Sequence, residues 1–300
     1  MTRISTANAQ VSQSPALPRT KDKRTFVTKQ SAPRPQEVDG TQTIHRALLV
    51  LRLLAGSAAS GMRLVDIAHG ARLHHSTTHR ILRALEQEGI VERLTNSRRY
   101  TIGSEVVWLG LGASSRFPIA TAAARALDRL SEQVGDAVFL SVHSGNDSIC
   151  ADRRIGSYPI QVLSIAIGSR RPLGVSQGGR VILAFLPPRV AQQVIAANAD
   201  RYARHELNPS TIVENMNMAR AQGYLCSDGV TVKGTRVVAV PILDVRGVAV
   251  AAISVIAVRH RLPSGRVPAV IESLKAAAKE ISLVLPIAAA NHLRQKPGRL

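Results

Sequence analysis

The sequence predicts an α+β protein with two folded domains. Its 300 residues exceed what one hydrophobic core usually serves, and 45% of them are apolar, enough for two cores. Apolar residues recur at helical spacing between residues 41 and 87, and a short hairpin pattern follows them. From residue 136 onward, strand-like runs and turns alternate with helical stretches, which is typical of helices packed on an antiparallel sheet.

Charge and cysteine content narrow the class of protein. The formal net charge of +19 favours nucleic acid or other anions as partners. Cys150 and Cys226 form neither a disulfide framework nor a zinc pattern, and they suit a reducing cytosol. No apolar run approaches the roughly 20 residues of a membrane span, and the N-terminus lacks the apolar core of a signal peptide. We therefore expect a cytoplasmic protein with no membrane partner.

Residues 1–40 are predicted to form a disordered basic tail, and residues 287–300 a second tail. The first is rich in Ser, Thr, Gln and Pro and carries seven Lys and Arg against three acidic residues. Such a tail either adds non-specific attraction to DNA phosphates or is simply solvated.

The first folded domain, residues 41–103, opens with two short helices. Helical spacing of apolar residues predicts Thr43–Ala55 as the first, ending before Gly56. Leu64–Gly70 is the second, and Gly70–Leu73 is the turn into a third.

The third helix has an apolar side and a polar, cationic side. Its predicted core residues are Thr78, Ile81, Leu82 and Leu85. Its candidate DNA-contacting residues, short hydroxyls and cations near the opposite side, are Ser76, Thr77, His79, Arg80 and Arg83. A solvated charged face explains this helix equally well when it is considered alone.

A hairpin follows the third helix. Ile90–Leu94 and Arg98–Ile102 are the predicted strands, joined by a turn over Thr95–Ser97. Three helices and a hairpin form the order of a winged helix-turn-helix, which places its third helix in the major groove of DNA. The wing brings Arg98 and Arg99 beside the DNA backbone or minor groove.

These segments resemble the N-terminal domain of IclR-family transcriptional regulators. The resemblance is carried by IHRALLVLRLLA, LVDIAHGARL, STTHRILRALEQEGIVER and RRYTIG. The family often has Pro-Lys where this chain has His74 and His75, which alters contacts at the start of the third helix. The resemblance implies a DNA-binding regulator, not an enzyme, that binds a near-palindromic operator.

Residues 104–134 are predicted to form linker helices, over Ser104–Ser114 and Pro118–Val134. The first carries more apolar surface than one buried stripe requires, which indicates packing on a second subunit or on its own domain. The family resemblance implies a homodimer through this region, and commonly a dimer of dimers.

The second folded domain, residues 135–286, is predicted to alternate strands and helices. The predicted strands are Ala137–His143, Ser148–Arg153, Ile160–Ile167, Arg236–Pro241 and Val248–Val258. The predicted helices are Val175–Phe185, Arg189–Ala197, Pro209–Gln222 with Asn208 as N-cap, and Pro268–Leu285.

This half also resembles the family, whose C-terminal effector domain is GAF-like. The matching segments are IGSRRPLGVSQGGRVILAFLP and RAQGYLCSDGVTVKGTRVVAVPILDVRGVAVAAISV. Carried over by position, the resemblance implies the effector-lining residues Ser176, Gln177, Gly178, Ser227, Thr235, Val237 and Ser254.

Two departures and the local charge suggest what the effector is. Val230 stands where the family usually has Glu, and Ile256 where some members have a polar residue, so the site favours an apolar or aromatic body. Residues 111–300 hold 23 Lys and Arg against 12 acidic residues. This excess attracts a small carboxylate, or it serves solubility and steering toward DNA.

Two alternatives belong to other classes. Gly174–Gly178 fits G-x-S-x-G, so Ser176 is a candidate hydrolase nucleophile, but Pro172 disrupts the central strand that such a serine needs before it. The other is an architectural DNA-binding protein without an effector. His75 and His79 have the i,i+4 spacing of metal ligands, yet no Cys or acid stands nearby, and we expect neither a metal nor a cofactor.

Overall fold

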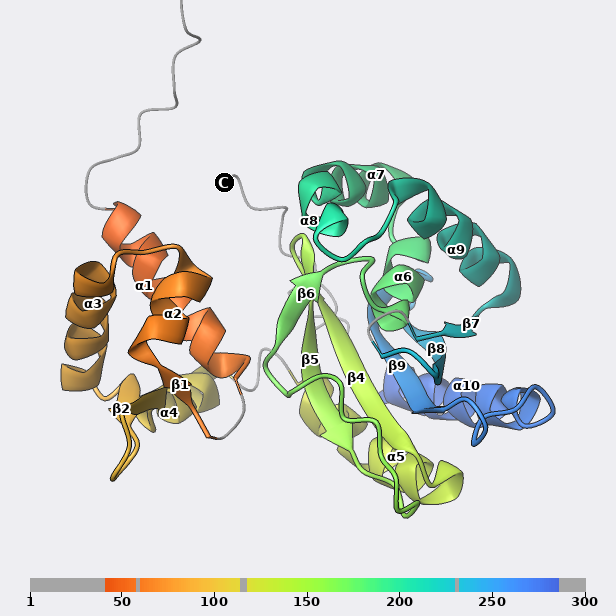
Figure 1. Cartoon of the computed structure of the whole chain (residues 1–300). Coiled ribbons are helices and arrows are strands. Elements are labelled where there is room, and N and C mark those ends of the chain that lie inside the picture. The colour runs from red at the N-terminus through yellow and green to blue at the C-terminus, as the bar shows by residue number, and fades with distance from the viewer. Residues whose placement is uncertain (1–40, 58–59, 114–117, 230–231, 286–300) are drawn as a thin grey trace, which may run out of the picture. The chain divides into compact units, whose positions relative to one another are not determined.

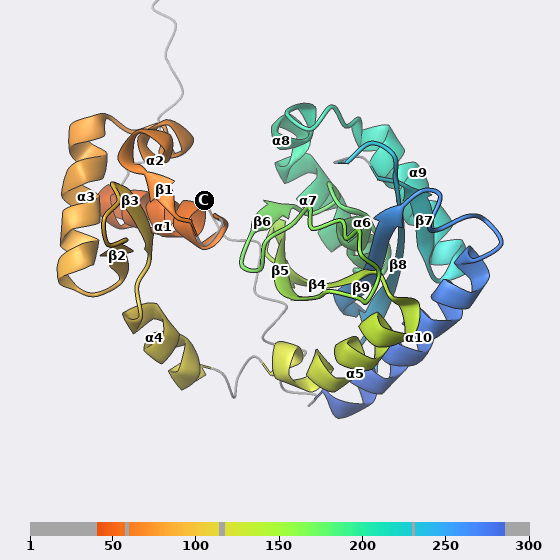
Figure 2. The same ribbon diagram turned by 60° about the horizontal axis from the view of Figure 1, so that its bottom comes forward.

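The computed structural model describes residues 41–57, 60–113, 118–229 and 232–285. The two predicted tails and Val230 lie outside these ranges. Figures 1 and 2 label helices and strands, which are numbered in chain order.

The first domain is a three-helix unit with a small sheet. Its helices are α1 (Thr41–Ala55), α2 (Leu64–Ala71) and α3 (His75–Gln87), and its strands are β1 (Met62–Arg63), β2 (Val91–Arg93) and β3 (Arg99–Ile102). The sheet order is β1-β3-β2, and both pairs are antiparallel. The three helices and the hairpin predicted from the sequence are confirmed. Strand β1 was not predicted, because two residues leave no periodic pattern.

The core of this domain is formed by one side of each helix and by the hairpin. Its buried members are Val50, Leu54, Ile67, Ala71, Ile81, Leu82, Val91 and Tyr100. Thr78 is also fully buried, and its Oγ1 donates to the carbonyl oxygen of His74 at 3.1 Å. This bond and the apolar stripe fix which side of α3 faces outward.

Two helices follow the hairpin. Helix α4 (Glu105–Ala113) has no buried residue although it is strongly apolar. Helix α5 (Ile119–Val134) buries a regular stripe that includes Ala123, Leu127 and Leu130. Gly135 ends α5 in the left-handed conformation, which suits glycine.

The second domain is a six-stranded antiparallel sheet with helices on both faces. Its strands are β4 (Ala137–Ser144), β5 (Asp147–Arg154), β6 (Arg170–Pro172), β7 (Leu225–Asp228), β8 (Thr235–Leu243) and β9 (Ala249–Val258). The sheet order is β6-β5-β4-β9-β8-β7. Its remaining helices are α6 (Gln177–Ala184), α7 (Pro188–Ala197), α8 (Ala199–Ala203), α9 (Pro209–Gln222) and α10 (Val267–Val284).

Each face of this sheet has its own core. Helices α5 and α10 lie against one face, and α6 and α9 cover the other (Figures 1 and 2). Strand β8 shows the alternation, because Val238 and Val240 pack toward α10 while Val237 and Ala239 face the other side.

The predicted strand over Ile160–Ile167 is wrong. These residues form no strand and instead run as irregular chain over the sheet, where Val162 is buried against Phe139 and Val237. Apolar residues that cover a sheet imitate the pattern of a strand within it. The strand in this region is β6, whose last residue is Pro172; at the sheet edge a missing N–H costs no ladder bond.

Two short elements, α8 and β7, were not predicted. No helix among the described residues is long and apolar enough to cross a membrane.

Candidate functional site

The outward side of α3 carries the residues predicted to contact DNA. Ser76, His79, Arg80 and Arg83 are exposed, and Thr77 is half-buried. Neither Arg80 nor Arg83 forms an ion pair with any other described residue. Both guanidinium groups therefore stay open to phosphates or base edges.

The start of α3 is also open to an anion. Its N-cap residue, His74, makes no side-chain capping bond, so the first backbone N–H groups of the helix are uncapped. A helix N-terminus of this kind attracts phosphate.

The wing carries two arginines, one with an exposed side chain and one that already forms a hydrogen bond within the domain. Asn96, in the turn between β2 and β3, adopts the left-handed conformation that tightens the hairpin. Arg98 is exposed at this turn. Arg99 is half-buried, and its Nη1 donates to the carbonyl oxygen of Gly61 at 2.9 Å, which ties the wing to the segment before β1.

A hollow of about 780 Å³ lies between the start of α3 and the wing. Its described lining contains no acidic residue and six basic ones: Arg63, His75, His79, Arg93, Arg98 and Arg99. Arg63 and Arg93 are exposed and were not among the predicted DNA-contacting residues. The alternation of side chains along β2 could have pointed to Arg93. Arg93 lies on the same face of the strand as the buried Val91, whereas Glu92 lies on the other face.

Six of the seven predicted effector residues line one small cavity in the second domain. They are Ser176, Gln177, Gly178, Thr235, Val237 and Ser254. The lining residues that the prediction did not include as effector contacts are Ser141, Ser164, Ile165, Arg171, Gly229, Val232 and Ile256. The cavity holds only about 20 Å³, room for roughly one water molecule. An organic effector can therefore enter only if the lining moves.

The start of α6 is fixed by its own sequence. Ser176 is the N-cap, and its Oγ accepts a hydrogen bond from the Gly179 N–H at 3.1 Å. A Cβ atom on Gly178 would lie 3.2 Å from the Ser141 Oγ, so glycine lets α6 approach β4 closely. Buried Arg180 donates from Nε to the carbonyl oxygen of Gly174 at 2.9 Å and holds the preceding turn.

Ser227 is the predicted effector residue that does not line this cavity. Its Oγ accepts from Nε2 of Gln177 at 3.2 Å, so it supports the cavity wall from behind. The same Nε2 atom donates to the carbonyl oxygen of Asp228 at 3.0 Å. Gln177 is thus oriented by strand β7, which was not predicted from the sequence.

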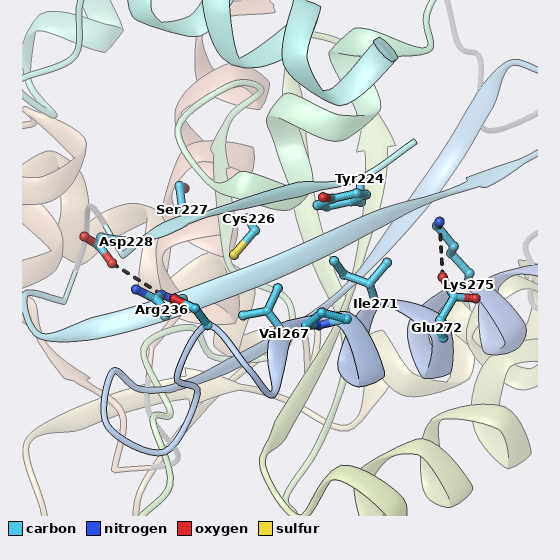
Figure 3. A pocket seen from close by; sticks show the side chains of 11 residues that line it. Tyr224, Cys226, Ser227, Asp228, Arg236, Val267, Ile271, Glu272 and Lys275 are labelled. Atoms are coloured by element: carbon cyan, nitrogen blue, oxygen red, sulfur yellow. Dashed lines mark hydrogen bonds and ion pairs between the residues drawn. The ribbon is translucent and has the colours of Figure 1, made fainter. Parts of the chain in front are cut away.

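Ser227 lines a second hollow instead, a groove of about 610 Å³ beside β7, β8 and α10. Cys226, Val267 and Ile271 form its apolar part (Figure 3). Its charges are paired: Arg236 lies 3.7 Å from Asp228, and Lys275 lies 3.4 Å from Glu272. Because these charges are already compensated, the groove offers an incoming ion less than the α3–wing hollow does.

The geometry of Ser176 does not support the hydrolase alternative. A nucleophile elbow holds its serine on a strained turn between a strand and a helix. Ser176 has φ −88° and ψ 158°, which is ordinary extended backbone, and its hydroxyl serves as a helix cap. The segment before it is the edge strand β6, not a central strand.

The described residues contain no group of three or more His, Cys, Asp or Glu side chains placed to hold a metal ion. His75 and His79 both line the α3–wing hollow.

Comparisons with known proteins match both halves of the chain to domains of one family. Residues 43–95 match the family model of the IclR helix-turn-helix domain. Residues 112–283 match that of the bacterial transcriptional regulator IclR C-terminal domain, more than half of the chain.

Individual relatives cover most of the chain. The glycerol operon regulatory protein of Streptomyces coelicolor is 34% identical over 228 residues, which is 74% of this chain and 86% of that protein. The probable transcriptional regulator SauR of Cupriavidus necator is 29% identical over 239 residues, 79% and 94% of the two chains.

One solved structure has a similar fold and a bound ligand. It is an IclR homolog from Microbacterium hydrocarbonoxydans in complex with 4-hydroxybenzoate, at 22% identity and a TM-score of 0.62. The match covers 80% of this chain and 98% of that one.

Proposed function

This chain belongs to the IclR family of transcriptional regulators, with a DNA-binding helix-turn-helix domain and a C-terminal effector domain, and from that premise we propose how it works. A small organic acid, bound in the cavity at the start of α6, controls how tightly the winged domain holds its operator. We expect the protein to lie in the cytoplasm, where operator DNA lies.

The proposed contacts with DNA lie on the outward side of α3. Ser76, Thr77, His79, Arg80 and Arg83 contact the major groove or its phosphates, because the opposite side of the helix is buried. Arg98 and Arg99 serve the wing, together with the basic lining of the hollow between α3 and the wing. For Arg99, contact with phosphate would use the guanidinium nitrogens that do not bind Gly61.

The effector half rests on the cavity at the start of α6. Its hydroxyls suit a carboxylate, and Val237 and Ile256 suit an apolar or aromatic body. The 4-hydroxybenzoate in the Microbacterium hydrocarbonoxydans structure makes that compound a sensible first probe, together with aliphatic acids.

The regulator acts as a homodimer through α4, and two dimers associate as a tetramer. Val107, Trp108 and Leu109 are each more than half exposed, and no residue of α4 is buried. A contiguous apolar helix surface of this kind marks a contact site. A near-palindromic operator requires two copies of the winged domain, so the partner is α4 of a second chain.

A thermal-shift screen of the full-length protein against small carboxylic acids tests the effector half. Ligand at a hundred times its Kd stabilises the protein by about 2.7 kcal/mol, which raises the melting temperature measurably. Ser176→Phe puts a large side chain into the lining of the cavity and should abolish the shift. A shift that survives Ser176→Phe would place the effector elsewhere.

A further inference from the structure

We infer that Arg171 is the side chain that binds the effector carboxylate, and that the carboxylate takes the place now held by the backbone carbonyl of Ser164. The inference rests on the proposed function, because it names the anchor within the same cavity. Arg171 was not among the predicted effector-lining residues.

The pairing of β5 with β6 places Arg171 on the cavity side of the sheet. Arg171 lies opposite Ser148 in the antiparallel register, and opposed residues project from the same face. Ser148 is buried near the start of α6, since its Oγ would lie 3.6 Å from a Cβ on Gly179. The neighbouring Arg170 is bound elsewhere, with its Nη1 3.3 Å from Oδ2 of Asp147.

Arg171 gives the lining of the cavity a positive charge. Among the described residues that line it, Arg171 is the one with an ionised side chain, and none is acidic. The hydroxyl-bearing residues around it are Ser141, Ser164, Ser176, Thr235 and Ser254. Burial lowers the pKa of Arg171, which is the cost of holding a cation in a partly desolvated place. An anion in the cavity would offset that cost.

Arg171 now helps to keep the cavity closed. Its Nη2 donates to the carbonyl oxygen of Ser164 at 3.0 Å. Arg153 Nη1 donates to the next carbonyl, that of Ile165, at 3.2 Å. Two arginines thus hold consecutive carbonyls of the irregular segment over the sheet, and Ser164 and Ile165 both line the cavity.

The exchange is favourable because a carboxylate is a stronger acceptor than a neutral carbonyl. It offers two charged oxygens in the geometry that a guanidinium matches with parallel hydrogen bonds. When the carboxylate takes the Arg171 donor, Ser164 is released and the segment can move outward to make room. The apolar side chains of Val237 and Ile256 then receive the body of the ligand. The ligand class is therefore a monocarboxylate with an apolar body.

The test compares Arg171→Gln with Arg153→Gln in the full-length protein. Both variants remove one positive charge beside the same segment, but only Arg171 lines the cavity. The probes are benzoate, 4-hydroxybenzoate and butyrate, each paired with its neutral amide. Thermal shift and titration calorimetry report binding, and the melting temperature without ligand reports folding.

We expect at least one acid, and not its amide, to bind the wild type. Arg171→Gln should then weaken that binding by about tenfold or more, because one charge-assisted pair is lost. Arg153→Gln should lose no more than about threefold in affinity, because it removes only a long-range charge, and freeing the Ile165 carbonyl makes the segment easier to move. Arg171→Lys keeps the charge without the paired donors, so an intermediate loss is expected even if Arg171→Gln folds poorly.

Three outcomes would overturn the inference. Equal affinity of the wild type and Arg171→Gln for the acid rejects the anchor and leaves the proposed function intact. Equal losses in Arg171→Gln and Arg153→Gln would show a general charge effect. If none of the acids binds the wild type, the carboxylate effector and its anchor are both rejected.

Discussion

At the scale of single residues, Arg80 and Arg83 are the side chains on which DNA recognition should depend most. Each is exposed on the outward side of α3. Arg80→Ala or Arg83→Ala should cost about 1–3 kcal/mol of operator binding if the side chain reads a base. If it contacts phosphate, the salt dependence should flatten by about one in log–log slope. Fluorescence anisotropy on a selected operator measures both quantities.

Arg189→Ala is the matched control for these two variants, because it removes the same charge from an exposed position on α7. It should bind the operator like the wild type. If Arg80→Ala and Arg83→Ala also bind like the wild type, α3 is not the recognition helix.

Ser176 should matter for stability as well as for ligand binding. Its Oγ caps α6, so Ser176→Ala should lower the free energy of unfolding by about 1 kcal/mol. Ser176→Asn keeps a capping oxygen and should lose less. Urea denaturation of the ligand-free protein measures the difference. An unchanged midpoint for Ser176→Ala would show that the cap contributes nothing.

Cys150 should be inert toward alkylation at ordinary pH. Burial raises the pKa of its thiol to about 11 from 9.0, so little thiolate forms below pH 9. Because the folded pKa lies above the unfolded one, the contribution of Cys150 to stability is complete below pH 9. It is lost as the pH rises from about 9 to about 11.

Mass spectrometry after iodoacetamide treatment follows both cysteines against pH. Cys226 is only half-buried, so it should be alkylated first. Modification of Cys150 at pH 8 as fast as that of Cys226 would contradict its burial.

At the scale of elements, helix α4 has an exposed apolar surface, which we propose a second subunit covers. Trp108, the chain's single tryptophan, is 62% exposed on it. If α4 forms the dimer, Trp108 fluorescence should shift to longer wavelength as the protein is diluted and the dimer dissociates. Sedimentation at the same concentrations measures the dissociation independently.

Leu109→Asp should shift the protein toward monomer, because a charge in an apolar interface leaves an unpaired buried group. Val213→Asp, at an exposed position on α9, is the control and should leave the dimer intact. If Leu109→Asp has the same oligomeric state as the wild type, the interface lies elsewhere.

The helices were predictable because their signals are local. The Asn208–Pro209 start and the Gly223 end of α9 are chemical features of the sequence itself, and the structure places the helix at Pro209–Gln222. Strands depend on pairing between distant residues, which explains the error at Ile160–Ile167 and the missed strand β7. An apolar run over a sheet and one within it have similar patterns.

For the candidate site too, residues within one continuous segment were predictable, whereas a residue placed by strand pairing was not. Ser176 and Gly178, which line the cavity, lie in one continuous segment that the family resemblance spans. Arg171 could not be assigned, because its side of the sheet is set by its register with Ser148 on β5. Ser227 does not line the cavity and instead accepts a hydrogen bond from Gln177, a contact that the sequence does not show.

At the scale of the whole molecule, the net charge of +19 should make DNA binding strongly dependent on salt. We expect ligand binding in the second domain to change the DNA affinity of the first. Coupling of this kind is typically about 1–3 kcal/mol, or roughly 5- to 150-fold in affinity.

The most direct measurement is operator affinity, by anisotropy at fixed salt, with and without an acid that stabilises the protein. A saturating amount of the acid should change the Kd for the operator at least about fivefold in the wild type. The neutral amide should change nothing, and Ser176→Phe should bind the operator without responding to the acid. An acid that binds the wild-type protein and leaves its operator affinity unchanged would show that the two domains are not coupled.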